Sequence, residues 1–262
     1  MAKAWWKWAL ALASLFGIFL LALHLSATEG DTRVAEELSA FSDANKRLIV
    51  MAPGLAGVEK FAPAVQVARQ ALPNSDVLVF AYDSSDLSNK SPYQISDAME
   101  VEVARRAGKY EEIVLIGHSM GGLLLRKAFI WGHGLQQDRP SQRVMADPHW
   151  TSKVSRFVSL APLNRGWSLE TKPTHMTYPQ YVLGRLLEPI LRLSRSAKMI
   201  LAIEAGSPFV ADGRLQWMAL SEIAARNNRS LPLTIHLLGD KDEIVAREDA
   251  AEVLAGDPDR RR

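Results

Sequence analysis

Gly117-His118-Ser119-Met120-Gly121-Gly122 is the stretch of sequence that decides the fold. It follows an apolar run over residues 112–116, which is typical of a buried strand, and precedes residues 121–131, whose apolar spacing predicts a helix. The Gly-x-Ser-x-Gly spacing predicts a sharp, strained turn at Ser119, because only small flanking residues let such a turn close. We therefore expect the Ser119 hydroxyl to project from the carboxyl edge of a sheet, where the helix N-terminus favours developing negative charge.

Further apolar, β-branched runs predict buried strands at residues 47–52, 76–81, 154–160 and 231–238. Helical spacing occurs at residues 61–72 and 95–106. Continuous apolar strands that alternate with helices indicate an α/β fold with a mostly parallel sheet covered by helices on both faces. We expect one globular domain over residues 47–262, preceded by a polar tether at 28–46.

Residues 161–230 contain no clear strand but include helical stretches at 180–203 and 215–226. A segment this long is more than an ordinary connection, so it predicts a helical cap or lid insertion. Its apolar side chains are expected either to line an acyl site or to seat the cap on the core, and they are Tyr178, Tyr181, Leu186, Leu187, Ile190 and Leu191.

The composition narrows the class of protein. The chain has 262 residues, which suits one large domain, and its net charge of +2 gives no case for nucleic-acid binding. Cysteine is absent, which excludes disulfides, cysteine-based metal sites and cysteine catalysis. No metal or cofactor is implied, and the oligomeric state is left open.

The N-terminus predicts targeting to a membrane. Lys3 and Lys7 precede an apolar run over residues 8–25, longer than the roughly 7–15 residues of a signal peptide. Leu25-Ser26-Ala27 is a poor cleavage site because Leu25 is not small. We therefore expect residues 1–27 to form an apolar helix that anchors the protein, with the catalytic domain outside the cytoplasm. A cleaved signal peptide and a buried soluble helix are the alternatives.

The motif around Ser119, in this strand–turn–helix setting, resembles that of the α/β-hydrolase superfamily, over about residues 48–255. Its Gly-His-Ser-Met-Gly-Gly form is similar to those of lipases, esterases and thioesterases, and the Gly-Ser-Pro-Phe stretch at 206–209 also resembles some lipase-like members. The resemblance implies that Ser119 is the nucleophile and that Gly117 and Gly121 are the glycines of its turn. The implied substrate is a small-molecule or lipid ester, or a thioester, cleaved through an acyl-enzyme.

The resemblance also implies an oxyanion hole. Ala52-Pro53-Gly54-Leu55 matches the loop that follows the first core strand in the superfamily, with Pro53 where His is common. The donors are then the backbone N–H groups of Leu55 and Met120, since the residue after the nucleophile supplies the second one. A plain Gly-Pro turn is the alternative reading of this loop.

The sequence supplies a candidate for the acid of the triad but none for the base. Residues 239–245 resemble the turn that presents the acid in the superfamily, which selects Asp242, although a solvated acidic turn is the alternative. The superfamily order places a His after the acid, yet no His follows Asp242. The base is therefore unassigned among the six histidines, which are His24, His118, His133, His149, His175 and His236.

These residues predict a serine hydrolase that ends before the superfamily's last strand and catalytic His. The expected consequence is a poor catalyst or none, because a Ser hydroxyl is a weak nucleophile without an adjacent base. The alternative that is not an enzyme is a catalytically dead hydrolase fold that serves as a membrane-tethered binding module. An acyltransferase, the acyl chain and the head group are left open.

Overall fold

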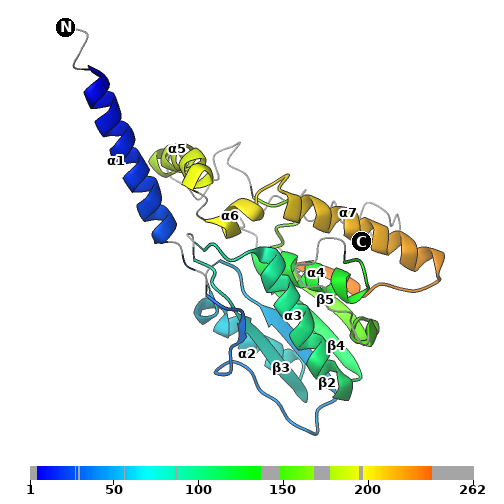
Figure 1. Ribbon diagram of the computed structural model, residues 1–262. Coiled ribbons are helices and arrows are strands. Elements are labelled where there is room, and N and C mark those ends of the chain that lie inside the picture. The colour runs from blue at the N-terminus through cyan, green and yellow to red at the C-terminus, as the bar shows by residue number, and fades with distance from the viewer. Residues whose placement is uncertain are drawn as a thin grey trace.

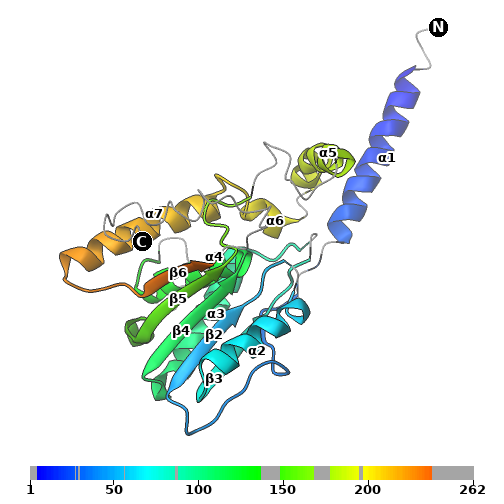
Figure 2. The same ribbon diagram turned by 180° about the vertical axis from the view of Figure 1, so that it is seen from behind.

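The computed structural model describes residues 5–26, 28, 30–55, 57–85, 88–136, 148–167, 178–194 and 197–237. Within these residues the central sheet has six strands in the order β1-β3-β2-β4-β5-β6 (Figures 1 and 2). The strands are β1 (Arg33–Val34), β2 (Arg47–Ala52), β3 (Ser75–Ala81), β4 (Glu112–His118), β5 (Val154–Leu160) and β6 (Leu233–Leu237). Neighbouring strands run parallel except β1, which is antiparallel to β3. The predicted α/β class with a mostly parallel sheet is confirmed.

Helices cover both faces of this sheet. The main ones are α2 (Ala62–Ala71), α3 (Pro92–Arg106), α4 (Met120–Gly132) and α7 (Pro208–Arg226). Ile49 and Met51 pack with Val65 of α2, whereas Leu48 and Val50 join the cluster formed with α3, α4 and α7. Figure 1 shows α3 in front of the sheet and Figure 2 shows α2 in front of it. Because successive side chains of a strand point to opposite faces, both must be apolar, which explains the continuous apolar runs.

The parallel register brings several chain segments to one edge. Ala52 of β2 pairs with Gly117 of β4, Gly117 with Ser159 of β5, and Ser159 with His236 of β6. The carboxyl ends of these four strands therefore share one edge of the sheet. The loop after β2, the turn after β4 and the ends of β5 and β6 all meet there.

Between β5 and β6 the described residues include the helices α5 (Tyr178–Ser194), α6 (Lys198–Ala202) and α7. The backbone N–H of Met199, in α6, donates to the carbonyl of Ser88 at 3.1 Å. Ser88 lies in the segment that follows the carboxyl end of β3, so α6 sits over the same edge as the turn after β4. Helix α5 lies beyond α6, beside α1 (Figures 1 and 2).

The opposite end of the sheet is held by a buried carboxylate. Asp76 is 0% exposed and accepts hydrogen bonds from the hydroxyl of Tyr110 at 2.6 Å, and from Asn45 and the backbone of Ser42, both at 2.8 Å. Lys109 forms an ion pair with it at 2.9 Å. Burial alone raises the pKa of Asp76, but the four donors outweigh burial and lower the pKa below its ordinary value.

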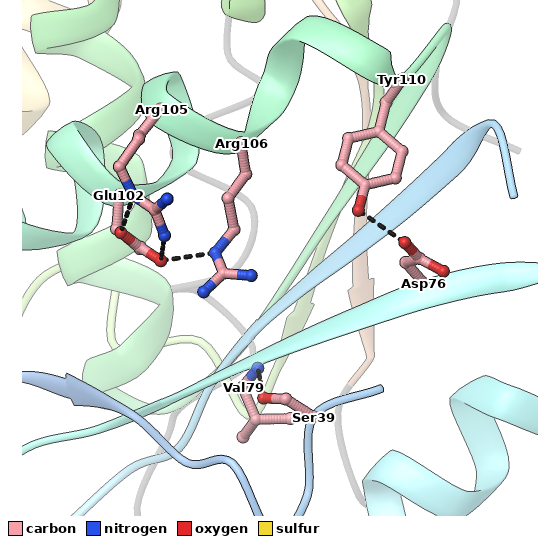
Figure 3. A network of polar contacts seen from close by, with 7 residues as sticks. All are labelled: Ser39, Asp76, Val79, Glu102, Arg105, Arg106 and Tyr110. Carbon is pink, nitrogen blue, oxygen red and sulfur yellow. Dashed lines mark hydrogen bonds and ion pairs between the residues drawn. The ribbon is translucent and has the colours of Figure 1, made fainter. Parts of the chain in front are cut away.

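Figure 3 shows this carboxylate together with two neighbouring contacts. Glu102, near the end of α3, pairs with Arg105 and Arg106, and Ser39 accepts a hydrogen bond from the backbone of Val79 at 3.0 Å. The segment before β2 is therefore fastened along β3. Strand β1 belongs to this segment, and its polar sequence did not predict a strand.

The predicted membrane anchor is not supported. Helix α1 covers Trp5–Leu25, but its side chains are described only from Ser14 onward, apart from Leu23. No helix in the described part of the chain is long and apolar enough to cross a membrane. The prediction that an apolar helix anchors the protein in a membrane, with the catalytic domain outside the cytoplasm, is contradicted by this finding.

Candidate active site

Ser119 occupies a strained turn between β4 and α4. Its backbone has φ 51° and ψ −122°, a conformation that residues with a side chain rarely adopt. The Ser119 N–H donates to the carbonyl of Leu160 at 2.8 Å, and the N–H of Gly122 donates to the Ser119 carbonyl at 3.0 Å. The surrounding strands thus hold the turn, and Ser119 is only half-buried. The predicted strand–turn–helix geometry is observed.

The two glycines that flank the turn have no space for a side chain. A Cβ atom on Gly121 would lie 2.3 Å from the carbonyl oxygens of both Ala52 and Pro53. A Cβ atom on Gly117 would lie 2.4 Å from the Cα of Gly122. Both distances are far inside van der Waals contact. The glycines therefore let the turn close and let the loop after β2 approach the helix.

That loop lies directly beside Ser119. A Cβ atom on Gly54 would be 3.1 Å from the Cβ of Ser119 and 2.8 Å from Nδ1 of His118. Within the loop, the N–H of Gly57 donates to the Gly54 carbonyl at 3.1 Å. The segment that the sequence singled out for oxyanion binding is therefore next to the Ser119 turn.

Tyr82 anchors the loop, and sequence reasoning missed it. Its buried hydroxyl donates to the carbonyl oxygen of Pro53. Burial raises the pKa of Tyr82, so the phenol stays protonated and remains a donor at any physiological pH. The only sequence signal is its place directly after the apolar run of β3, at the carboxyl edge of the sheet.

The two expected oxyanion donors differ in their surroundings. Met120 is the first residue of α4 and is fully buried, so its N–H belongs to the first helical turn, which has no intrahelical acceptors. No acidic residue lies in that turn, so the positive end of the helix dipole is uncompensated. Leu55 is half-buried and packs against the core. Such a setting can stabilise negative charge that develops next to Ser119.

Three of the six histidines are far from the Ser119 turn or outside the described residues. His133 follows the last residue of α4, about 20 Å from the N-terminus of that helix. His149 lies in the 3-10 helix η3 (Pro148–Lys153), which precedes β5 and is therefore at the opposite edge of the sheet. His175 lies outside the described residues, as does the expected acid Asp242.

The other three histidines are described by the structure and lie on α1, β4 and β6. His24 is near the end of α1. The ring of His118 faces Phe61, with centroids 6.1 Å apart, and its Nδ1 lies beside Gly54. His236 pairs in register with Ser159, and neither of its buried ring nitrogens has a hydrogen-bond partner among the described residues. Burial, and then the charge of Arg126, lower the pKa of His236 to about 4, so the ring is neutral at physiological pH.

A metal or cofactor site is not suggested by the side chains described. Within this part of the chain no group of three or more His, Asp or Glu residues could hold a metal ion. The described features beside Ser119 are its strained backbone, the Gly54 loop and the N-terminus of α4.

Part of the chain matches a model of a known lipase family. The family model for class 2 lipases matches residues 100–182, which is less than half of the chain and includes β4, the Ser119 turn and α4. No curated protein matched.

Several solved structures are similar to the chain. Monoacylglycerol lipase of Paleococcus ferrophilus is 12% identical, with TM-score 0.45, over 87% of this chain and 84% of the lipase. Phospholipase PlaB of Legionella pneumophila is 16% identical, with TM-score 0.42, over 74% of this chain and 39% of PlaB. Lipase B of Aspergillus fumigatus is 15% identical, with TM-score 0.37, over 50% of this chain and only 28% of the lipase.

The resemblance to a superfamily rests on the features of this chain and on the lipase model. The mostly parallel sheet, the serine turn between β4 and α4 and the glycines that close it occur together. The class 2 lipase model matches the part of the chain that contains this turn. The fold and the serine turn of the chain are similar to those of the α/β-hydrolase superfamily.

Proposed function

We propose that this protein hydrolyses carboxylic esters or thioesters through an acyl-enzyme formed on Ser119. The observation that carries the proposal is the strained Ser119 turn, with the Gly54 loop against it and the N-terminus of α4 behind it. A strained turn of this kind costs energy and persists where function requires it. The match to the class 2 lipase model supports the same reaction class.

In the proposed mechanism the Ser119 oxygen attacks the carbonyl carbon of the ester and gives up its proton to a base. The N–H groups of Leu55 and Met120 stabilise the resulting oxyanion, and losing one such donor costs about 3–4 kcal/mol in comparable sites. The intermediate collapses, the alcohol leaves with the proton, and Ser119 keeps the acyl group. Water then releases the acid and restores the Ser119 hydroxyl.

The mechanism also needs a base that takes the Ser119 proton and an acid that orients this base. Asp242 is the proposed acid that orients the base. The base itself is unassigned, and His133 and His149 are poor candidates because the fold places them away from the Ser119 turn. The alternative of a catalytically dead binding module is not favoured, since the lipase model matches the segment that contains the nucleophile.

We propose that residues 161–230 act as a cap that contributes an apolar acyl site, which makes a lipid ester the favoured substrate. Tyr178 and Leu186 on α5 are 70% and 63% exposed, so they do not serve to seat the helix on the core. Ile190 and Leu191, on the same helix, are half-buried. The side chains of Tyr181 and Leu187 lie outside the described part of the chain.

Covalent labelling with a fluorophosphonate tests the proposed function. The probe forms a bond to an activated serine oxygen with loss of fluoride. We expect mass spectrometry to find the adduct on the peptide that contains Ser119, in the unmodified protein and in the control Ser152→Ala. Ser152 is exposed and lies in η3, at the opposite edge of the sheet. Equal labelling of Ser119→Ala, or no adduct on Ser119 in the folded protein, would contradict the proposal.

A further inference from the structure

His118 is the last residue of β4 and directly precedes Ser119. Val114 and Ile116, which lie four and two residues earlier, belong to the apolar cluster under α2. Because alternate side chains of a strand share a face, the His118 ring is expected on that side of the sheet. The ring indeed lies against Phe61, a member of the same cluster. The imidazole therefore points to the side of the sheet opposite α4, the helix that begins after Ser119.

The loop after β2 lies against the His118 ring at both of its ends. At the near end, a Cβ atom on Gly54 would lie 2.8 Å from Nδ1 and 3.3 Å from Cε1 of His118. At the far end, the centroid of the Phe61 ring is 6.1 Å from that of His118, and the two rings are tilted by 34°. Phe61 is 5% exposed and ends the 3-10 helix η1 (Glu59–Phe61). One imidazole therefore supports the start and the end of this loop.

Two backbone hydrogen bonds close turns within the loop, between these contacts. The N–H of Gly57 donates to the carbonyl of Gly54 at 3.1 Å, and the N–H of Phe61 donates to the carbonyl of Val58 at 3.0 Å. The segment between the two contacts is thus folded back on itself rather than extended. Its position therefore depends on the side chain against which both of its ends rest.

Gly54 is enclosed from two sides. A Cβ atom on Gly54 would also lie 3.1 Å from the Cβ of Ser119, so its backbone fits between the His118 ring and the nucleophile. Since Gly54 has no side chain, the width of the ring decides how near the loop comes to Ser119. The next residue is Leu55, whose N–H is a proposed oxyanion donor. A displacement of about 1 Å in such a site can cost about a hundredfold in rate.

We propose that His118 is a positioning residue, whose ring fixes the distance between the Ser119 turn and the Gly54 loop. This role requires the width of the ring and not its basicity, so it differs from the role of the base. Its effect on catalysis rests on the proposed hydrolysis at Ser119, whereas the spacing is a property of the folded protein. The alternative is that the ring only fills space beside Phe61. Changes at positions 54 and 118 would then act independently.

Thermal unfolding of single and double variants of the full chain tests the spacing without a substrate. We expect Gly54→Ala to lower the Tm by about 3–9 °C, because its methyl group overpacks the space beside the ring. In a His118→Ala background the same change should cost less than half as much, since the ring is gone. In a His118→Phe background, which keeps a ring, it should cost as much as in the unmodified protein.

Gly108→Ala is the matched control, because a Cβ atom there would have no neighbour within 4 Å. It should change the Tm by less than about 2 °C in every background. An equal loss from Gly54→Ala with and without the ring would overturn the proposal. The His118→Phe background keeps the test decisive if His118→Ala does not fold. A loss from Gly54→Ala that fell below half of its usual size in this background would also overturn the proposal.

Hydrolysis of p-nitrophenyl butyrate tests the effect on catalysis. We expect His118→Ala to lower kcat about 10–100-fold and to change KM by about twofold or less, because a displaced oxyanion donor is missed in the transition state. His118→Phe has no basic nitrogen and should keep kcat within about threefold. A His118→Phe variant as slow as His118→Ala would overturn the proposal, since the imidazole nitrogens would then be needed. If the unmodified protein showed no hydrolysis that depends on Ser119, the proposed function would fail, and the thermal comparison would still decide the role of His118.

Discussion

A methyl group at position 121 would lie 2.3 Å from the carbonyl oxygens of Ala52 and Pro53. Both oxygens belong to backbone that is held by β2 and by the hydroxyl of Tyr82, so neither can yield easily. We expect Gly121→Ala to destabilise the protein by about 1–3 kcal/mol, the usual cost of overpacking a core. It should also remove ester hydrolysis, because it pushes the Gly54 loop away from Ser119.

Gly122→Ala is the matched control for that change. Its Cβ would have Oγ of Ser159 as nearest neighbour, at 3.6 Å, an ordinary van der Waals distance. Urea unfolding and hydrolysis measured on both variants separate a local clash from a general intolerance of side chains. If Gly121→Ala were as stable and as active as Gly122→Ala, the described contact between loop and turn would be wrong.

Asp76 gives a prediction about acid stability. Its pKa is lowered in the folded protein because the donors around it outweigh burial. A lowered pKa means that the carboxylate stabilises the fold above the ordinary Asp value of 3.8, and that this contribution is lost as the pH falls through the folded value. We expect Asp76→Asn to cost about 3 kcal/mol at pH 7 and to flatten the dependence of stability on pH below about 4.

Urea unfolding at pH 7 and pH 3 measures both effects. The exposed Asp43→Asn is the control and should behave as the unmodified protein at both values. A variant Asp76→Asn that loses as much stability on acidification as the unmodified protein would show that Asp76 is not the group responsible.

At the scale of elements, helix α5 carries the prediction about substrate. Leu186 is 63% exposed on α5, and Leu215 is 65% exposed on α7. If α5 contributes to an acyl site, Leu186→Asp should lower kcat/KM about tenfold for an octanoyl ester and leave an acetyl ester within about twofold. Leu215→Asp should change neither. Hydrolysis of p-nitrophenyl esters of increasing acyl length makes the comparison, and equal losses on both esters would count against the cap proposal.

The strands of the parallel sheet could be predicted from sequence because each is buried on both faces. The runs at 47–52, 76–81, 112–117 and 154–160 are continuous and apolar, and the structure has strands at these places. Strand β1 could not be predicted, since Arg33–Val34 is a two-residue edge strand whose pairing with β3 comes from tertiary contact. The same limit applies to α6, which is only five residues long.

The candidate site, like the fold, could be predicted from sequence only in part. Gly-x-Ser-x-Gly predicted the Ser119 turn because its chemistry is local. The role of Tyr82 depends on a contact between segments far apart in the chain, and no local pattern predicts it. The roles of Leu55, Met120 and Asp242 stay predictions. The prediction of a membrane anchor is contradicted, since no helix among the described residues is long and apolar enough to cross a membrane.

At the scale of the whole molecule, the topology brings the loop after β2, the Ser119 turn and the ends of β5 and β6 to one edge of the sheet. It places His133 at the far end of α4 and His149 at the opposite edge. Within the described residues this edge gathers the parts on which the proposed hydrolysis by Ser119 depends. Hydrolysis that requires Ser119 is the expected behaviour of the protein.

The most direct test of the central claim is the rate of p-nitrophenyl butyrate hydrolysis by the purified chain and by Ser119→Ala. The account predicts hydrolysis above the buffer rate in the unmodified protein and in Ser152→Ala, and the buffer rate in Ser119→Ala. Circular dichroism should show that all three proteins are folded. Hydrolysis by folded Ser119→Ala at the rate of the unmodified protein would contradict the claim that Ser119 is the nucleophile.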